Sequence, residues 1–297
     1  MAEKIFRIGI VGGAGAAVIA DFMHKTIRHA ADRRSTMQLC MLVEQSPRIA
    51  DRAENLIGAG PDLTIALHAA CRKLEAAGAD LIAIPCNTPR AFVQRVQPHL
   101  RVQIANMLDV TARHVADAFP IRREVGLLAT SGTLASGVYE RTLEVHGKTL
   151  VLPSAAAQSR LMDAIYGASG VKAGFLSGAC QDDLRAALED LSSRGVDVVI
   201  LGCPELAVLP QPSVANRGGR VASLIDPASV LAQHCVAFAE QGVARRVAGS
   251  LQAGAARHDR PRGPPASTGP EACSDSCLVA TADLAARAFT SNRRASS

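Results

Sequence analysis

The sequence predicts an α/β fold with two pseudo-symmetric α/β lobes, mostly parallel sheets and an active site in the cleft between the lobes. Short apolar runs alternate with helix-like segments, which is typical of parallel strands joined by helical crossovers. The pattern of residues 78–86 recurs 117 positions later, at 195–203, as a turn glycine, an aspartate, four apolar residues, a spacer and a cysteine. With 297 residues and 48% apolar content, the chain is long enough for two lobes.

The offset of 117 residues also relates other parts of the two halves. It pairs apolar positions of the preceding helical segments and an apolar run near the start of each half. Because one offset covers several element types, we expect a duplicated α/β unit. The matched positions are Leu67 and Leu184, Ala70 and Ala187, Leu74 and Leu191, and the runs 8–11 and 125–128.

In the first half, apolar runs predict strands and periodic segments predict helices. Pro47 lies in a polar stretch that predicts a loop, and Gly78 is expected to end the second helix. The expected elements are a strand over 5–11, a helix over 16–33, a strand over 37–43, a loop over 44–53, a helix over 62–77 and a strand over 81–84.

The second half repeats this order. Its expected elements are a strand over 124–129, a helix from about 133 to 145, a strand over 149–152, helices before Gly195, strands over 198–201 and 220–225, and a helix over 227–241. The expected domains are an N-terminal lobe over 1–117, to which the chain returns after about residue 221, a C-terminal lobe over 118–220, a closing strand and helix over 221–245, and a disordered tail over 246–297 that is rich in Ala, Gly, Ser, Arg and Pro.

Composition and charge narrow the function classes. The formal net charge is +5, but aromatic residues make up only 3% of the chain and tryptophan is absent, so little is available to stack on bases. No apolar run approaches the roughly 20 residues that span a bilayer, and residues 1–7 lack the order of a signal peptide. We therefore expect a cytoplasmic protein with a small-molecule ligand and neither a nucleic-acid nor a membrane partner.

Cys86 and Cys203 are the candidate catalytic residues, because each lies one spacer residue beyond a predicted strand of one half. Ligands of open parallel sheets bind beyond the carboxyl ends of the strands. A thiol with a pKa near 8.5 is a suitable base for a carbon acid, and inverting a stereocentre needs one such group on each face. The alternative is that both are buried packing thiols.

Polar residues at the same strand ends are candidates for binding a carboxylate. Asn87 and Thr88 follow Cys86, Glu205 lies two residues after Cys203, and Ser131 and Thr133 follow the strand that begins the second half. Backbone N–H groups at the starts of helices would hold an anion there, although the same residues also suit helix caps.

A glycine-rich turn and two cations complete the candidate set. The turn Gly12-Gly13-Ala14-Gly15 lets the backbone pass close to a small substrate, which makes Gly13 a candidate contact. As a dinucleotide fingerprint the turn fails, because Val18 replaces the third glycine. Arg52 and Lys172 are cations in predicted loops, where they either bind a ligand or are solvated.

From about Arg7 to Gln241 the chain resembles the aspartate/glutamate racemase family, the cofactor-independent amino-acid racemases, and most closely its aspartate racemase branch. The paired cysteine motifs are the specific part of this resemblance. The matching segments are Gly-Ile-Val-Gly-Gly at 9–13, Ala20-Asp21-Phe22, Asp51-Arg52, Pro85-Cys86-Asn87-Thr88, Ser131-Gly132-Thr133, Lys172-Ala173-Gly174, Leu201-Gly202-Cys203 and Glu205-Leu206.

The resemblance implies a two-lobed fold with Cys86 and Cys203 as the acid/base thiols. It also implies that the α-carboxylate binds to Asn87, Thr88 and Thr133, and that a side-chain carboxylate binds to Arg52 and Lys172. Members resemble one another in needing no pyridoxal phosphate and no metal, and they are often dimers. An isomerase without cofactor, acting as a homodimer on an acidic amino acid, is therefore expected.

The chain departs from the family pattern at several positions, one of which is next to the second thiol. Pro204 replaces a threonine, which removes a hydroxyl and a backbone N–H, and Ile19 and Arg90 replace a threonine and a histidine. Two alternatives to racemisation stay open. One is an isomerase or decarboxylase of a small dicarboxylate in the same superfamily, and the other is a non-catalytic protein that binds acidic amino acids.

Overall fold

The computed structural model describes residues 5–12, 16–32, 39–45, 62–87, 90–214, 219 and 221–258. The chain divides into a compact unit, Met1–Leu251, which holds both β-sheets, and a second unit, Gln252–Ser297. Within the described ranges, no helix combines the length and the apolar character that crossing a bilayer requires.

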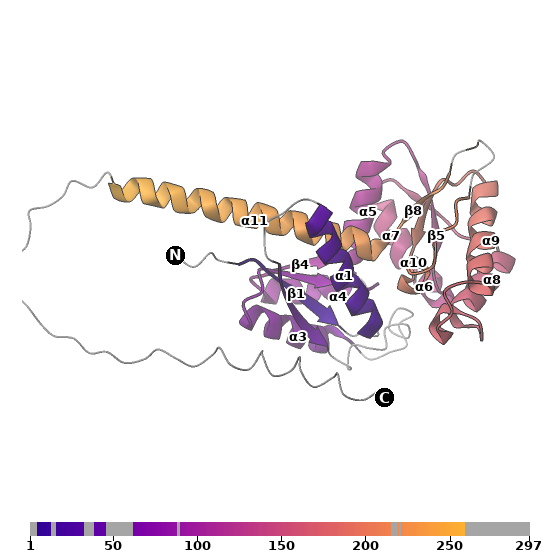
Figure 1. Cartoon of the computed structure of the whole chain (residues 1–297), viewed down its shortest axis with the longest axis horizontal. Helices are drawn as coiled ribbons and strands as arrows, with labels where there is room; N and C mark the ends of the chain where they lie inside the picture. The colour runs from indigo at the N-terminus through magenta and orange to yellow at the C-terminus, as the bar shows by residue number, and fades with distance from the viewer. Residues whose placement is uncertain are drawn as a thin grey trace, which may run out of the picture. The chain divides into compact units, whose positions relative to one another are not determined.

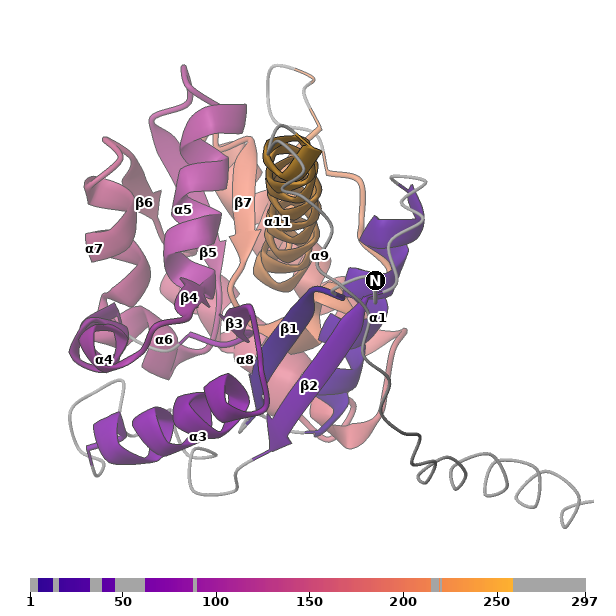
Figure 2. The ribbon, with the colours of Figure 1, turned by 90° about the vertical axis from the view of Figure 1, so that its left-hand side faces the viewer.

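The first sheet has four parallel strands in the order β2-β1-β3-β4. Helices α1 and α3 lie on opposite sides of β1 and β2 (Figure 2). The elements of this part of the chain are β1 (Arg7–Gly12), α1 (Ala16–Asp32), β2 (Cys40–Gln45), α3 (Thr64–Ala76), β3 (Leu81–Ile84), α4 (Arg90–Val96), the 3-10 helix η2 (Gln97–His99), β4 (Gln103–Asn106) and α5 (Met107–Ala118).

The second sheet has the same architecture, with four parallel strands in the order β6-β5-β7-β8. Its last strand leads directly into the long helix α11, which lies beside α1 and β1 (Figure 1). The elements are β5 (Glu124–Leu128), α6 (Ser131–Ser136), α7 (Val138–Glu144), β6 (Thr149–Val151), α8 (Ala155–Tyr166), the 3-10 helix η3 (Val171–Ala173), α9 (Ala179–Ser193), β7 (Val198–Leu201), α10 (Pro204–Ala207), β8 (Ser223–Ile225) and α11 (Pro227–His258).

The predicted duplication is confirmed by the pairing of the central strands. Gly9 pairs with Ile82 between β1 and β3, and the positions 117 residues later, Gly126 and Val199, pair between β5 and β7. The turn glycines that follow α3 and α9 both have a positive φ, 84° at Gly78 and 89° at Gly195. Glycine adopts this conformation without steric cost, so both helices end in the same way.

Helices cover both faces of each sheet, because alternate residues of a strand point to opposite sides. Leu81 and Ala83 pack towards α1 and α11, whereas Ile82 and Ile84 pack towards α3 and α4. The second sheet is covered by α5 and α7 on one face and by α8 and α9 on the other. The apolar positions that the repeat matched in α3 and α9 are buried in the corresponding cores.

The structure differs from the sequence-based expectation at three places. The helix expected over about 133–145 is two helices, α6 and α7, because Gly137 adopts a left-handed conformation with φ 61°. Strand β4 and helix α5 were not expected. Helix α11 ends at His258 rather than at 241. Residues 246–258, which the sequence predicts as part of the tail, are therefore helical, and their alanines and arginines favour this.

Candidate functional site

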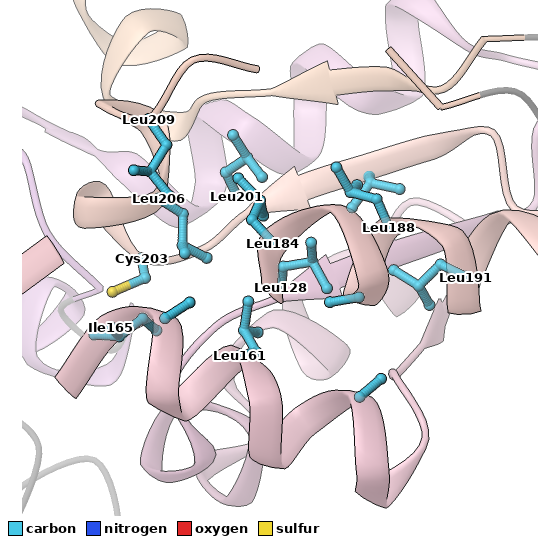
Figure 3. Close-up of a cluster of buried hydrophobic side chains, with 14 of the residues drawn as sticks. Leu128, Leu161, Ile165, Leu184, Leu188, Leu191, Leu201, Cys203, Leu206 and Leu209 are labelled. Atoms are coloured by element: carbon cyan, nitrogen blue, oxygen red, sulfur yellow. The ribbon is translucent and has the colours of Figure 1, made fainter. Parts of the chain in front are cut away.

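Both candidate thiols lie where the sequence predicts, two residues after the last residues of β3 and β7. Cys86 is 8% exposed and packs against the core of α3 and α4, and Cys203 is 5% exposed and packs against the core of α8 and α9. In Figure 3 the sulfur of Cys203 points away from Leu184 and Leu161 of its core. Each thiol is therefore at the edge of its own core, as the duplication requires.

A hydrogen bond between the two halves joins the segments that carry the thiols. The Asn87 side chain, next to Cys86, donates from Nδ2 to the carbonyl oxygen of Gly202, next to Cys203, at 2.8 Å. The Tyr139 hydroxyl donates to Asn87 Oδ1 at 2.9 Å. The residue that follows one thiol is therefore fixed against the residue that precedes the other.

Cys203 is the N-cap residue just before helix α10, and its thiol donates a hydrogen bond to Glu205 Oε2 at 3.0 Å. The other oxygen of this carboxylate lies 3.5 Å from Nζ of Lys172, which belongs to η3. The Lys172 ammonium also lies 4.6 Å from the ring centroid of Tyr166, which is typical of a cation–π contact. The structure thus brings together three of the residues singled out in the sequence.

The surroundings of Cys203 favour its protonated form. Burial is the largest cause that raises its pKa, followed by the negative charge and hydrogen bond of Glu205. The backbone N–H of Glu205 and the charge of Lys172 act in the opposite direction but are outweighed. Pro204 occupies the first position of α10, where a missing backbone N–H costs the helix little stability. The backbone N–H of Glu205 still donates a hydrogen bond to the sulfur.

Burial is the largest single effect on Lys172 and lowers its pKa, but the charge and hydrogen bond of Glu205 together with the electrostatic effects of Tyr166 and Cys203 outweigh it, so the pKa is raised. With its side chain 45% exposed, Lys172 is charged and open to solvent at neutral pH. A cation so placed is available to a ligand carboxylate as well as to Glu205.

Tyr139 belongs to this site and interacts electrostatically with Asp226, and neither residue was predicted from the sequence. Tyr139 is buried, and its pKa is raised first by burial and then by electrostatic interactions with Cys203 and Asp226. Nζ of Lys25 lies 2.7 Å from Asp226 and 2.5 Å from Asp21. Asp226 follows β8 directly, so its place after a strand was a usable signal.

Ser131 and Thr133 lie in the first turn of α6, just after β5. The Thr130 side chain caps this helix by accepting from the backbone N–H of Thr133 at 3.3 Å, and the Thr130 and Thr133 hydroxyls are 3.1 Å apart. Ser131 is exposed, and its hydroxyl accepts from Gln158 at 3.2 Å. The cap predicted as an alternative role is therefore present, and it belongs to Thr130.

Three of the predicted site residues, Gly13, Arg52 and Thr88, lie outside the described residues. Among the residues that the structure does describe, His, Cys, Asp and Glu side chains do not gather in groups of three that could hold a metal ion.

The Asp/Glu/Hydantoin racemase family model matches residues 11–235 of the chain. The chain is 25% identical over 150 residues to the broad specificity amino-acid racemase of Bacillus subtilis, covering 48% of this chain and 63% of that protein. It is 29% identical over 184 residues to a glutamate racemase of Corynebacterium kroppenstedtii, covering 57% and 59%. The matches thus span about three fifths of these relatives.

Among solved structures, an aspartate racemase homologue of Pyrococcus horikoshii superposes with a TM-score of 0.64 at 24% identity, covering 80% of this chain and all of that one. The aspartate racemase of Picrophilus torridus superposes with a TM-score of 0.60 at 23% identity, covering 79% and 94%. At these identities the likeness concerns the fold, and it confirms the predicted pair of parallel α/β lobes.

Proposed function

Because the chain belongs to the Asp/Glu/Hydantoin racemase family, we propose that it inverts the α-carbon of an acidic amino acid, such as aspartate or glutamate, by proton transfer between two cysteine thiols. The enzyme class predicted from the sequence, an isomerase of the racemase type, agrees with this family. The names glutamate racemase and broad specificity amino-acid racemase, carried by sequence relatives, support an amino-acid substrate.

The observation that carries this proposal is the hydrogen bond from Asn87 to the carbonyl of Gly202. It holds the segment of Cys86 against the segment of Cys203, so one small substrate between them would meet both. In one direction Cys86 removes the α-proton and Cys203 delivers a proton to the opposite face. In the other direction the two thiols exchange roles.

Asn87, Thr88, Ser131 and Thr133 are proposed to bind the α-carboxylate. The Asn87 amide nitrogen carries two hydrogens, and the carbonyl of Gly202 takes one of them. Donors aimed at the carboxylate stabilise the charge that develops on it as the α-proton leaves. No pyridoxal phosphate and no metal enters this mechanism.

Lys172 and Arg52 are proposed to bind the side-chain carboxylate, and Gly13 to let the backbone approach the substrate. The raised pKa of Lys172, in which Glu205 and its other neighbours together outweigh the effect of burial, supports a cation at neutral pH. Glu205 was predicted as a further substrate contact, and that role stays a prediction.

Incubation with L-amino acids in heavy water, followed by proton NMR and chiral chromatography, tests the proposal. Aspartate or glutamate is expected to lose its α-proton signal while the D-enantiomer accumulates. Cys86→Ser and Cys203→Ser should each abolish racemisation. Cys40→Ser, which changes a half-buried thiol of β2, is the matched control and should keep the parent rate.

Racemisation at the parent rate in both thiol variants would contradict the mechanism. Turnover of maleate or a substituted malonate, without turnover of amino acids, would favour the dicarboxylate isomerase or decarboxylase instead. Thermal stabilisation by an acidic amino acid without deuterium uptake would favour the binding protein.

We expect a homodimer that works in the cytoplasm, as the family resemblance implies. Analytical ultracentrifugation measures the oligomeric state. A monomer that racemises at full rate would remove the dimer from the proposal.

A further inference from the structure

We propose that Glu205 holds a hydrogen on the Cys203 sulfur, which makes Cys203 the proton donor and Cys86 the base of the unliganded enzyme. The inference deepens the proposed function and rests on it, since it assigns unequal starting roles to the two thiols of the same site. It also gives Glu205 a role towards a reacting atom rather than towards the substrate.

The contact between Cys203 and Glu205 carries the inference. An ionised carboxylate has no hydrogen and only accepts hydrogen bonds. A sulfur that is 3.0 Å from such an oxygen must therefore supply the hydrogen, because a thiolate at this place would face a second negative charge. The geometry fits Cys203 as a thiol and not as a thiolate.

Lys172 lies against the other oxygen of Glu205. Its ammonium lies 3.5 Å from the oxygen of Glu205 that does not face the thiol, so the carboxylate bridges a cation and a thiol. The pair is anchored from two elements, α10 and η3, which pack against each other.

The charged and titratable groups around the Cys203 sulfur come from three elements. Glu205 of α10 is the negative group in contact, Lys172 of η3 is the positive group behind it, and the buried hydroxyl of Tyr139 on α7, in the same half of the chain, interacts electrostatically with Cys203. The backbone N–H of Glu205 also donates a hydrogen bond to the sulfur. Burial and Glu205 outweigh Lys172 and this N–H, so the pKa of Cys203 is raised, in agreement with the geometry.

The chemical step balances without any further reactant. The bond from the α-carbon to its hydrogen breaks, and the proton goes to the Cys86 sulfur. The S–H bond of Cys203 breaks, and its proton goes to the opposite face of the α-carbon. Cys86 is then a thiol and Cys203 a thiolate beside Glu205, and exchange of one proton at each sulfur with solvent restores the starting state.

Titration of Cys203 tests the inference directly. The ultraviolet absorbance of the thiolate is followed with pH in the full-length parent and in each variant, and the curve of the matching Cys203→Ser protein is subtracted. Glu205→Gln keeps the side-chain volume and removes the charge, so the pKa of Cys203 should fall by about one unit and the thiolate population below that pKa should rise about tenfold.

Lys172→Met should act in the opposite direction, because it removes the cation that favours the thiolate. Glu144→Gln removes an exposed carboxylate of α7 and is the matched control, with no shift expected. The alkaline limb of the racemisation profile should follow the same order, moving to lower pH in Glu205→Gln and to higher pH in Lys172→Met.

An unchanged titration in Glu205→Gln, with an altered KM for the substrate, would overturn the inference and leave Glu205 as a substrate contact. Shifts of Glu205→Gln and Lys172→Met in the same direction would also overturn it, since they would reflect a loosened site. The titration needs no turnover, so it stays decisive even if racemisation is absent and the proposed function fails. Racemisation with an unchanged titration would leave the function standing without the inference.

Discussion

At the scale of single residues, Tyr139 is the group that connects the two halves of the site to the surrounding core. Its ring is buried and its hydroxyl donates to Asn87 Oδ1, while the other end of the same amide holds Gly202. An Asn amide held at both ends has one orientation. Tyr139 therefore fixes which Asn87 atom faces the second half of the site.

Tyr139→Phe is predicted to lower both stability and racemisation. The change removes one hydrogen bond and leaves Asn87 Oδ1 without that donor, which should cost about 1 kcal/mol in the free energy of unfolding. The rate should fall because the Asn87 amide is no longer held in one orientation. Urea unfolding and the chiral assay measure the two effects.

Tyr166→Phe is the matched control, because Tyr166 is the only other tyrosine of the sequence. Its side chain is half exposed, and the ring that contacts Lys172 is retained in phenylalanine. Parent stability and rate are expected. Equal losses in both variants would show that the Tyr139 hydroxyl has no special role.

The positions of the thiols could be predicted from the sequence, but the hydrogen bonds around them could not. Cys86 and Cys203 could be predicted because each ends a copy of the repeat, and a repeat is visible along the chain. The bond from Tyr139 to Asn87 spans 52 residues, and that from Asn87 to Gly202 spans 115. Such contacts depend on how the halves pack, which hydrophobic periodicity does not encode.

At the scale of elements, the end of β7 packs closely against β5 and α7. A Cβ added at Gly202 would lie 2.7 Å from Cδ1 of Leu127, 3.0 Å from Cβ of Ala129 and 3.3 Å from the ring of Tyr139. Leu127 and Ala129 are buried in a filled core, so neither has room to move away. The absence of a side chain at Gly202 is what lets the thiol-bearing segment lie against β5.

Gly202→Ala is accordingly predicted to destabilise the protein by about 1 to 3 kcal/mol, the usual cost of overpacking a core. Racemisation should fall as well, because the carbonyl that binds Asn87 would be displaced with the backbone. Gly132→Ala is the stability control, since a Cβ there meets nothing within 4 Å. Chemical unfolding of the two variants decides the matter: equal midpoints would contradict the close packing at Gly202.

At the scale of the whole molecule, the duplication explains how much of the fold could be predicted. The central strands β1, β3, β5 and β7 were expected within two residues of their observed bounds, because buried parallel strands appear as continuous apolar runs. Strand β4 was not predicted, because it is four residues long and begins with an exposed glutamine. The end of α11 was placed too early because composition suggested a tail before the helix had ended.

The last prediction concerns where the C-terminal region stops contributing to the fold. Gly242 and Val243 of α11 lie against the core of the first sheet, where a Cβ at Gly242 would come within 2.6 Å of the buried ring of Phe6. A chain ending at Leu251 keeps these contacts and corresponds to the compact unit Met1–Leu251. It should therefore unfold at the parent temperature and racemise at the parent rate.

A chain ending at Gln241 loses Gly242 and Val243 and exposes apolar surface of Phe6. At about 25 cal/mol per Å² of apolar surface, exposing part of these side chains should lower the free energy of unfolding by about 1 to 2 kcal/mol. Thermal unfolding of both truncated chains, followed by circular dichroism, measures the difference. Equal stability would show that α11 stops contributing before Gly242, and a loss already at Leu251 would show that residues 252–297 contribute to the compact unit.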